Sequence, residues 1–307
     1  MNSKNIKAVL SKRVKDWFKS IKDDEVRKLA EKNTIVTGGS IVSMLLGEEV
    51  KDFDIYFRNK ETTKAIAEYY VKEFNKTHEN IVVVLDGSDT KDIENDLTAM
   101  RNLSKDRIKV YIRSAGVAAD DPEALKSSFD DVFDVLKANE TQDALEEKEK
   151  YRPVFLSSNA ITLSNKIQLV VRFYGEPEEI HKNYDFVHCT NYWTSWNNEL
   201  ILHPLALESI LSKELKYSGS LYPVCSVIRT RKFLARGWTI NAGQYLKMLF
   251  QVSQLDLTNI DVLEDQLIGV DSTYFNILID ALRSKQENDS AFILGAGYIS
   301  TIIDKIF

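Results

Sequence analysis

One short stretch near the N-terminus limits most strongly what this chain can fold into. Residues 34–37 have the composition of a short strand, and a turn of two glycines and a serine at residues 38–40 follows directly. Residues 41–46 predict a helix of one or two turns that ends before Gly47. Residues 52–57 begin with alternating polar and apolar side chains and predict a second strand. This order of elements indicates an α/β unit.

The second predicted strand carries two carboxylates, Asp52 and Asp54. Residues two apart on a strand point to the same face, with Cα atoms about 6.5 Å apart. Such a pair is suited to two divalent cations about 3.5–4 Å apart, although a two-metal site normally needs a third carboxylate from another strand. The alternative is a solvated strand edge that binds nothing.

Gly38, Gly39 and Ser40 lie where the predicted helix begins. The unpaired backbone N–H groups and the positive end of the helix dipole favour a phosphate there, and glycine lets the backbone approach it closely. The alternative is a tight turn that needs positive φ and has no ligand.

This combination resembles the signature of the DNA polymerase β-like nucleotidyltransferase superfamily. It consists of the turn at residues 38–40, the intervening residues 41–51 and the strand with Asp52 and Asp54. The resemblance implies an α/β (α+β) fold with a small mixed sheet, followed by a mainly helical domain. It implies transfer of a nucleoside monophosphate from a nucleoside triphosphate (NTP) to a hydroxyl acceptor. Asp52 and Asp54 would hold two Mg²⁺ or Mn²⁺ ions, and Ser40 with the adjacent amides would bind the β and γ phosphates.

The resemblance also implies a third carboxylate on a following strand, and Asp185 is the best candidate. It is the acidic residue of residues 184–189, which have the composition of a strand. It would complete the metal site and favour deprotonation of the acceptor. A lone acid in an apolar strand costs several kcal/mol unless it is paired or bound to metal. The alternative is therefore a salt bridge, to Arg172 or Lys182.

A basic stripe is predicted on the helix that follows. Arg229, Lys232 and Arg236 are three and four residues apart and would share one helix face, suited to a triphosphate or an acceptor backbone. The alternative is a solvated face. Tyr217 and Trp238 are candidates for stacking on a base, with burial in the core as the alternative.

Two further stretches, residues 155–189 and 228–238, look like a group of bacteriophage-encoded nucleotidyltransferase-like proteins. In that group the third acid falls on the position of Asp185. The resemblance covers about residues 33–58 and 152–247 and is specific for the superfamily rather than for the substrate.

Poly(A) polymerases and CCA-adding enzymes would be distant relatives. Class II CCA-adding enzymes carry Arg-Arg-Asp and Glu-Asp-x-x-Arg motifs for base selection. In the nearest strings of this sequence, Gly237 replaces an acid and Ile268 replaces an arginine. CCA addition is therefore not expected, and template-independent transfer to an RNA or tRNA 3′ end is the first expectation.

The net charge of −6 hides an uneven distribution that agrees with an RNA partner. Residues 86–150 hold 17 acidic and 10 basic residues, whereas residues 1–32 hold 10 basic and 5 acidic ones. Residues 208–247 hold 7 basic and 2 acidic residues. Two basic segments flanking an acidic one are consistent with a nucleic-acid groove.

The same patterns predict three parts along the chain. These are basic helices at 1–32, a catalytic domain at 33–198 with an insertion at about 86–150, and a helical domain at 199–307. Residues 5–32 predict a helix, and the insertion predicts a strand at 108–112 and a helix at 122–136.

Composition places the chain among ordinary folded proteins, with 44% hydrophobic and 28% charged residues. No segment approaches the ~20 apolar residues of a membrane span, and the first residues lack the apolar core of a signal peptide. A cytoplasmic protein is expected, in the host cytoplasm if a phage encodes it. Cys189 and Cys225 cannot make a disulfide framework, and no Cys-x-x-Cys or close His pair predicts zinc.

Two alternatives to RNA tailing stay open. The same fold could nucleotidylate a protein or synthesise a cyclic oligonucleotide, and RNA would then be dispensable. A chain that keeps the fold without catalysis would act as an interaction protein, an interpretation that the predicted carboxylate trio disfavours.

Overall fold

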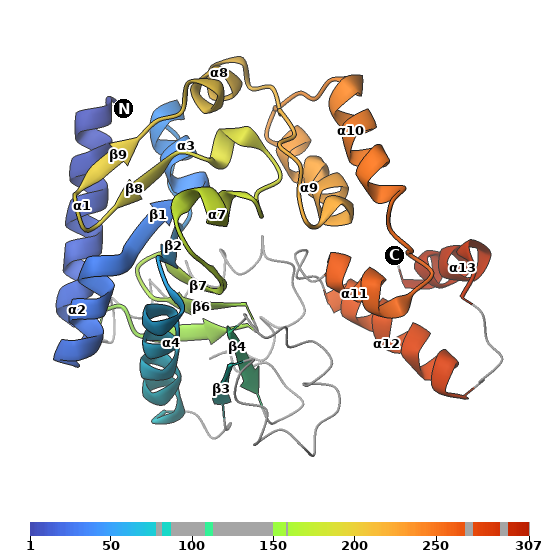
Figure 1. The fold of residues 1–307 in the computed structure, drawn as a ribbon, viewed down its shortest axis with the longest axis horizontal. Coiled ribbons are helices and arrows are strands. Elements are labelled where there is room, and N and C mark those ends of the chain that lie inside the picture. The colour runs from blue at the N-terminus through green and yellow to red at the C-terminus, as the bar shows by residue number, and fades with distance from the viewer. Residues whose placement is uncertain are drawn as a thin grey trace.

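The computed structural model describes residues 1–77, 82–86, 108–112, 150–157, 159–267, 273–288 and 294–306. The helix predicted at residues 122–136 lies outside them. Within this part of the chain, no helix is long and apolar enough to cross a membrane. Figure 1 shows an α/β part that includes the N-terminal helices, followed by a helical part.

The α/β part is built on a mixed sheet with the strand order β5-β6-β7-β2-β1-β8-β9. The strands are β1 (Thr34–Thr37), β2 (Phe53–Phe57), β5 (Pro153–Leu156), β6 (Ala160–Leu163), β7 (Ile167–Tyr174), β8 (Tyr192–Thr194) and β9 (Glu199–Ile201). β2 pairs antiparallel with β1 and parallel with β7, so it lies inside the sheet. The predicted order of strand, turn, helix α3 (Gly39–Leu46) and strand is confirmed, and it occupies the middle of the sheet.

One face of this sheet is apolar and packs against three helices. These are α1 (Ser3–Ser20), α2 (Asp24–Asn33) and α4 (Lys60–Asn75). Trp17 of α1, Phe57 of β2 and Leu169 of β7 belong to the same buried cluster. The N-terminal helices are therefore part of the main core, and the opposite face of the sheet is left for other side chains.

The helix predicted over residues 5–32 is two helices. The first ends at Ser20, and the Asp23 carboxylate accepts hydrogen bonds from the amides of Glu25 and Val26 at the start of the second. An aspartate at this capping position satisfies amides that have no partner inside the helix, so a new helix begins there.

A small second sheet lies beside α4. It consists of β3 (Val82–Asp86) and β4 (Ile108–Ile112), which pair antiparallel. The strand predicted at residues 108–112 is thus confirmed.

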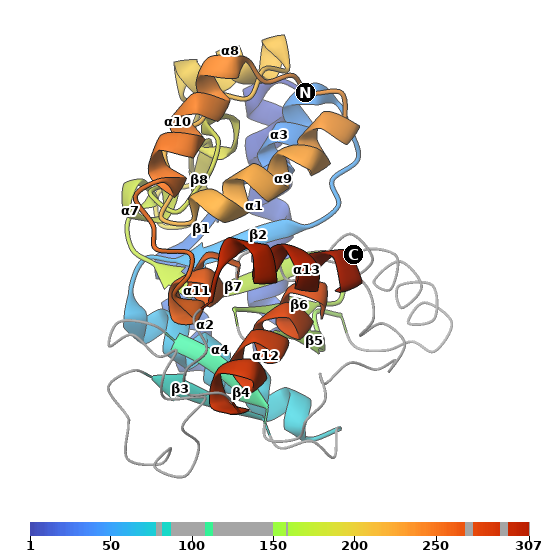
Figure 2. The same ribbon diagram turned by 90° about the vertical axis from the view of Figure 1, so that its right-hand side faces the viewer.

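The helical part follows the last strand of the main sheet. Its helices are α8 (Pro204–Ser212), α9 (Pro223–Ala235), α10 (Ala242–Val252), α11 (Ile260–Leu267), α12 (Thr273–Asn288) and α13 (Ala296–Ile306). One apolar cluster joins α8, α9 and α10 to α3, and another joins α11, α12 and α13 to α9. Figure 2 shows these helices from the side. The predicted fold class, a mixed α/β core followed by helices, is confirmed, and α9 links its parts.

Residues 184–189 are not the strand that the sequence predicts. A short helix α7 (Pro177–His181) comes first, and residues Val187–Cys189 form one turn of 3-10 helix. Only a short backbone pairing remains, in which Val187 N–H donates to Lys216 and Ser218 N–H donates to Asp185. The apolar composition of this segment reflects burial of side chains such as Phe186 beneath the helical part rather than a strand.

Candidate active site

Asp52 and Asp54 are placed by strand β2 at the middle of the sheet. β2 begins at Phe53, so Asp52 comes directly before the strand rather than within it. Phe53, Ile55 and Phe57 are buried in the core against the N-terminal helices. Because side chains alternate along a strand, Asp54 points to the opposite face of the sheet.

The glycine turn lies directly against Asp54. Gly38 has φ +91° and precedes α3, and a Cβ atom added to it would lie 3.0 Å from Asp54 Oδ2. Both the backbone angle and this close approach require glycine. The turn and the carboxylate, predicted as parts of one site, are therefore brought together.

The two carboxylates are desolvated and affect each other. Burial raises the pKa of Asp52, and burial together with the Asp52 charge raises the pKa of Asp54 well above its ordinary value. No ion pair that the described residues form with one another involves either aspartate. The fold thus holds two acids together at a cost to the ionised state.

Helix α9 brings positive charge toward this pair. Lys232 lowers the pKa of both aspartates, and Arg236 lowers that of Asp52. Lys232 is half-buried, whereas Arg236 and the neighbouring Arg231 are exposed. Two of the three cations of the predicted stripe therefore act on the carboxylates instead of only facing solvent.

Ser40 lies in the first turn of α3, and its hydroxyl points into the interior of the described part of the chain. The side chain is only 1% exposed, and its Oγ is one of the buried polar atoms without a partner within the described residues. A buried hydroxyl without a partner costs about 1–3 kcal/mol. Its place beside the amides of a helix N-terminus suits an anionic ligand.

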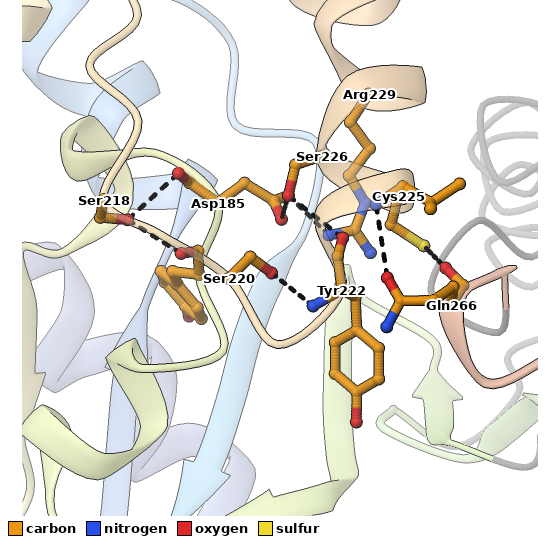
Figure 3. Close-up of polar contacts among 10 residues, drawn as sticks. Asp185, Ser218, Ser220, Tyr222, Cys225, Ser226, Arg229 and Gln266 are labelled. Atoms are coloured by element: carbon orange, nitrogen blue, oxygen red, sulfur yellow. Dashed lines mark hydrogen bonds and ion pairs between the residues drawn. The ribbon is translucent and has the colours of Figure 1, made fainter. Parts of the chain in front are cut away.

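Asp185 does not join the other two carboxylates. Its Oδ2 accepts a hydrogen bond from Arg229 Nη1 at 2.6 Å, and its Oδ1 accepts one from the Ser226 hydroxyl at 2.7 Å (Figure 3). Across the described ranges, no three His, Cys, Asp or Glu side chains are grouped to hold a metal ion. The structure therefore brings Asp52 and Asp54 together and engages Asp185 in a salt bridge instead of grouping it with them. Its partner is neither of the two bases expected, Arg172 and Lys182.

The aromatic candidates belong to the core. Tyr217 is 5% exposed, packs edge-on against Phe186 and donates its hydroxyl to Gln251. Trp238 is also buried and packs against His188 with the two rings tilted. The structure therefore places both aromatic side chains in the core, as the alternative expects.

Three polar side chains at the site were missed from the sequence. Gln168 of β7 is the register partner of Asp54 in the parallel pair, so both project from the same face. Tyr56 and Tyr184 share a hydrogen bond, and burial raises the pKa of both. A glutamine between Ile167 and Leu169 was a visible signal, since it is polar within an apolar strand.

The pair fits a divalent cation in its donor chemistry. Mg²⁺ and Mn²⁺ prefer carboxylate oxygens, and a cation would relieve the repulsion that raises the pKa of Asp54. Asp52 and Asp54 are the residues that would hold it, with the Gln168 side chain beside them.

Comparison with protein families assigns the chain. A model described as "Gabija anti-defense 2 family protein" matches residues 8–213, which include the sheet, the glycine turn and all three aspartates. The chain belongs to this family. As a member of the Gabija anti-defense 2 family, it is similar to "Gabija anti-defense 2" of Bacillus phage SPbetaL7, with 22% identity over 125 residues. That match covers 40% of this chain and 31% of the relative.

Solved structures of tRNA-processing enzymes are also similar to this family member. The Bacillus stearothermophilus CCA-adding enzyme in complex with CTP is 11% identical, with a TM-score of 0.39, covering 86% of this chain and 51% of that one. The Thermotoga maritima CCA-adding enzyme complexed with tRNA is 12% identical, with a TM-score of 0.36, covering 89% and 53%. This chain thus spans about half the length of these structures, and TM-scores this low do not establish a common fold.

Proposed function

We propose that this Gabija anti-defense 2 family member is a metal-dependent nucleotidyltransferase that moves a nucleoside monophosphate from an NTP to a hydroxyl. The observation that supports this most is the half-buried pair Asp52 and Asp54, which lies against the Gly38 turn and is acted on by Lys232. Phosphoryl transfer requires carboxylates for a metal ion, backbone amides that bind phosphate, and cations that neutralise its charge. The aspartate pair, the glycine turn at the start of α3 and the cations of α9 correspond to these parts.

Each part has a role in this proposal. Asp52 and Asp54 hold a divalent cation, which when bound would neutralise charge on the phosphates. The Ser40 hydroxyl and the adjacent amides bind the β and γ phosphates, and Lys232 and Arg236 stabilise their charge. The acceptor oxygen forms a bond to the α phosphorus, its proton passes to solvent, and the bond to pyrophosphate breaks.

The first acceptor in this proposal is an RNA 3′ end. The basic segment at residues 208–247 holds seven bases and two acids and contains α9, whose Lys232 and Arg236 act on the aspartates. Charge of this kind attracts a phosphate backbone. Transfer to RNA stays a prediction from charge and resemblance.

A polypeptide or nucleotide acceptor is the second candidate. The observation that favours it is the family description, which names an activity against the Gabija defence. Covalent modification of a component of that defence would act directly on such a target.

A transfer assay tests the function. Each α-labelled NTP is incubated with the chain, Mg²⁺ or Mn²⁺, and either an RNA pool, Gabija proteins or no acceptor. We expect labelled product with wild type and a loss of about 10²–10³-fold in Asp54→Asn. Asp304→Asn, an exposed residue of α13, is the matched control and should be unaffected. Absence of product under every condition would overturn the proposal.

A plating assay separates catalysis from simple binding. Bacteria carrying Gabija are infected with a sensitive phage while expressing wild type, Asp52→Asn or Asp304→Asn. If transfer counters the defence, wild type and Asp304→Asn restore plaques and Asp52→Asn does not. Full restoration by Asp52→Asn at equal expression would instead support an interaction protein that needs no chemistry.

A further inference from the structure

We infer that Asp185 is a positioning residue, which anchors helix α9 through Ser226 and Arg229 so that Lys232 and Arg236 face the Asp52–Asp54 pair. The inference rests on the proposed function for its meaning in catalysis. It assigns to Asp185 a task different from the metal ligation expected from the sequence.

Both oxygens of the Asp185 carboxylate are engaged by α9. Oδ1 accepts from the Ser226 hydroxyl at 2.7 Å, and Oδ2 accepts from Arg229 Nη1 at 2.6 Å (Figure 3). Ser226 and Asp185 are 0% and 7% exposed. A hydrogen bond between charged groups in such a shielded place is strong and has one preferred geometry.

The backbone of Asp185 is held by Ser218. Its carbonyl accepts hydrogen bonds from the amide and the hydroxyl of Ser218, at 3.0 and 3.1 Å. Ser218 belongs to the segment that leads into α9, so the aspartate is tied to the start of the helical part by its backbone as well as by its side chain. These contacts fix Asp185 relative to the segment that precedes α9.

The helical repeat carries this anchoring to the active site. Arg229, Lys232 and Arg236 are spaced by three and four residues, so they lie along one face of α9. Fixing Arg229 and Ser226 therefore sets the rotation of the helix about its axis. A rotation of one residue, about 100°, would turn Lys232 away from the aspartates.

The N-terminal end of α9 is held separately. Gln266 of α11 accepts from the Val224 amide at 3.3 Å and donates to the Leu221 carbonyl at 2.9 Å. These contacts lie on the side of the helical cluster of α11–α13, whereas Asp185 holds the side that faces the α/β part. Loss of Asp185 should therefore loosen the orientation of α9 without unfolding it.

Steady-state kinetics with varied NTP at saturating Mg²⁺ test the anchor. Asp185→Asn should raise KM for NTP about tenfold while kcat changes by less than about threefold, since the cations that Asp185 positions bind the substrate equally in the ground and transition states. The Mg²⁺ concentration for half-maximal rate should be unchanged. Arg229→Lys keeps the charge but removes the planar guanidinium, so it should reproduce the KM effect in a chain that folds.

A double-mutant cycle and a control complete the design. Adding Arg229→Gln to Asp185→Asn should change KM by less than about twofold, because the anchor is already broken. Glu208→Gln breaks the exposed Lys216–Glu208 pair and should leave kinetics unchanged.

Two results would overturn the anchor. If Asp185→Asn lowered kcat more than a hundredfold with KM and folding unchanged, or raised the Mg²⁺ requirement tenfold, Asp185 would be a metal ligand. If both Asp185→Asn and Arg229→Lys had wild-type kinetics, no anchor would exist. A wild-type chain that transfers nothing overturns the proposed function itself, and the anchor with it.

Discussion

Two acidic places in this protein are both desolvated, yet they are built in opposite ways. Asp185 has each carboxylate oxygen matched, by Ser226 and Arg229. Asp52 and Asp54 adjoin each other, and the charge of one raises the pKa of the other. The first arrangement stabilises the fold, whereas the second is tolerated by it.

This difference shows how a structural acid is distinguished from a functional one. A buried charge with a partner of opposite charge is stabilised by that partner, whereas two desolvated like charges repel each other until a ligand of opposite charge binds. The same three residues look equivalent in the sequence as acids near apolar strands. Only the groups that surround them in the folded protein distinguish Asp185 from Asp52 and Asp54.

The largest expected effect is the loss of stability when Asp185, the paired acid, is removed. Asp185→Ala should lower the free energy of unfolding by about 3 kcal/mol, because the largely shielded ion pair and hydrogen bond between Asp185 and Arg229 would be lost. The value is at the low end for a broken buried pair, since the Arg229 side chain is 35% exposed. Chemical denaturation measures it.

Glu208→Ala is the matched control for that measurement. It breaks an ion pair of similar length, 2.6 Å, on the surface, and should cost less than about 1 kcal/mol. Equal losses of unfolding free energy in the two variants would show that burial does not strengthen the Asp185–Arg229 pair. The contrast between the two acidic places would then not hold.

The next effect concerns the cation that faces the unpaired acids. Lys232→Met should raise KM for NTP about tenfold, which corresponds to about 1.4 kcal/mol, because it removes a half-buried ammonium near the phosphates. Arg231→Gln, next to it but exposed, should change KM by less than twofold. Equal effects of the two variants would indicate general attraction by a basic surface.

The sequence was most informative where the site is local. The glycine turn and the two aspartates lie within residues 38–54, and the spacing of strand, helix and strand is enough to predict that they meet. The spacing of Arg229, Lys232 and Arg236 likewise predicted a shared helix face. Short separations along the chain make such contacts nearly independent of the remaining fold.

The contacts that the sequence did not predict join distant segments. Arg229 and Asp185 are 44 residues apart, and nothing in either neighbourhood selects Arg229 over Arg172 or Lys182. Gln168 comes beside Asp54 only because β7 pairs parallel with β2, a register that needs the whole sheet. The segment around Phe186 has the apolar composition of a strand, but helices rather than a sheet bury it.

Asp54→Asn should reveal the cost of the unpaired acids. Because the folded state raises the pKa of Asp54, it retains a proton that the unfolded chain releases, so stability falls as pH rises through the folded pKa. Without added metal, Asp54→Asn should be more stable than wild type by about 1 kcal/mol at alkaline pH and equal to it at acidic pH.

Thermal unfolding between pH 4 and pH 9, with and without Mg²⁺, checks this linkage. Added Mg²⁺ should stabilise wild type at high pH and leave Asp54→Asn unaffected, since the cation binds the ionised pair. A wild-type stability that rises steadily with pH in the absence of metal would mean that Asp54 is compensated in the same way as Asp185.

The smallest effect is expected at Ser40, whose hydroxyl has no hydrogen-bond partner among the residues that the structure describes. Removing it by Ser40→Ala should raise KM for NTP about threefold, because the hydrogen bond that this neutral hydroxyl donates to a phosphate disappears. Stability should not fall, since no contact within the protein is removed. Ser43→Ala, one turn further along α3, should change neither quantity. If Ser40→Ala lowered stability with KM unchanged, the hydroxyl would be a structural group, and the phosphate would be bound by the backbone amides and the cations of α9 alone.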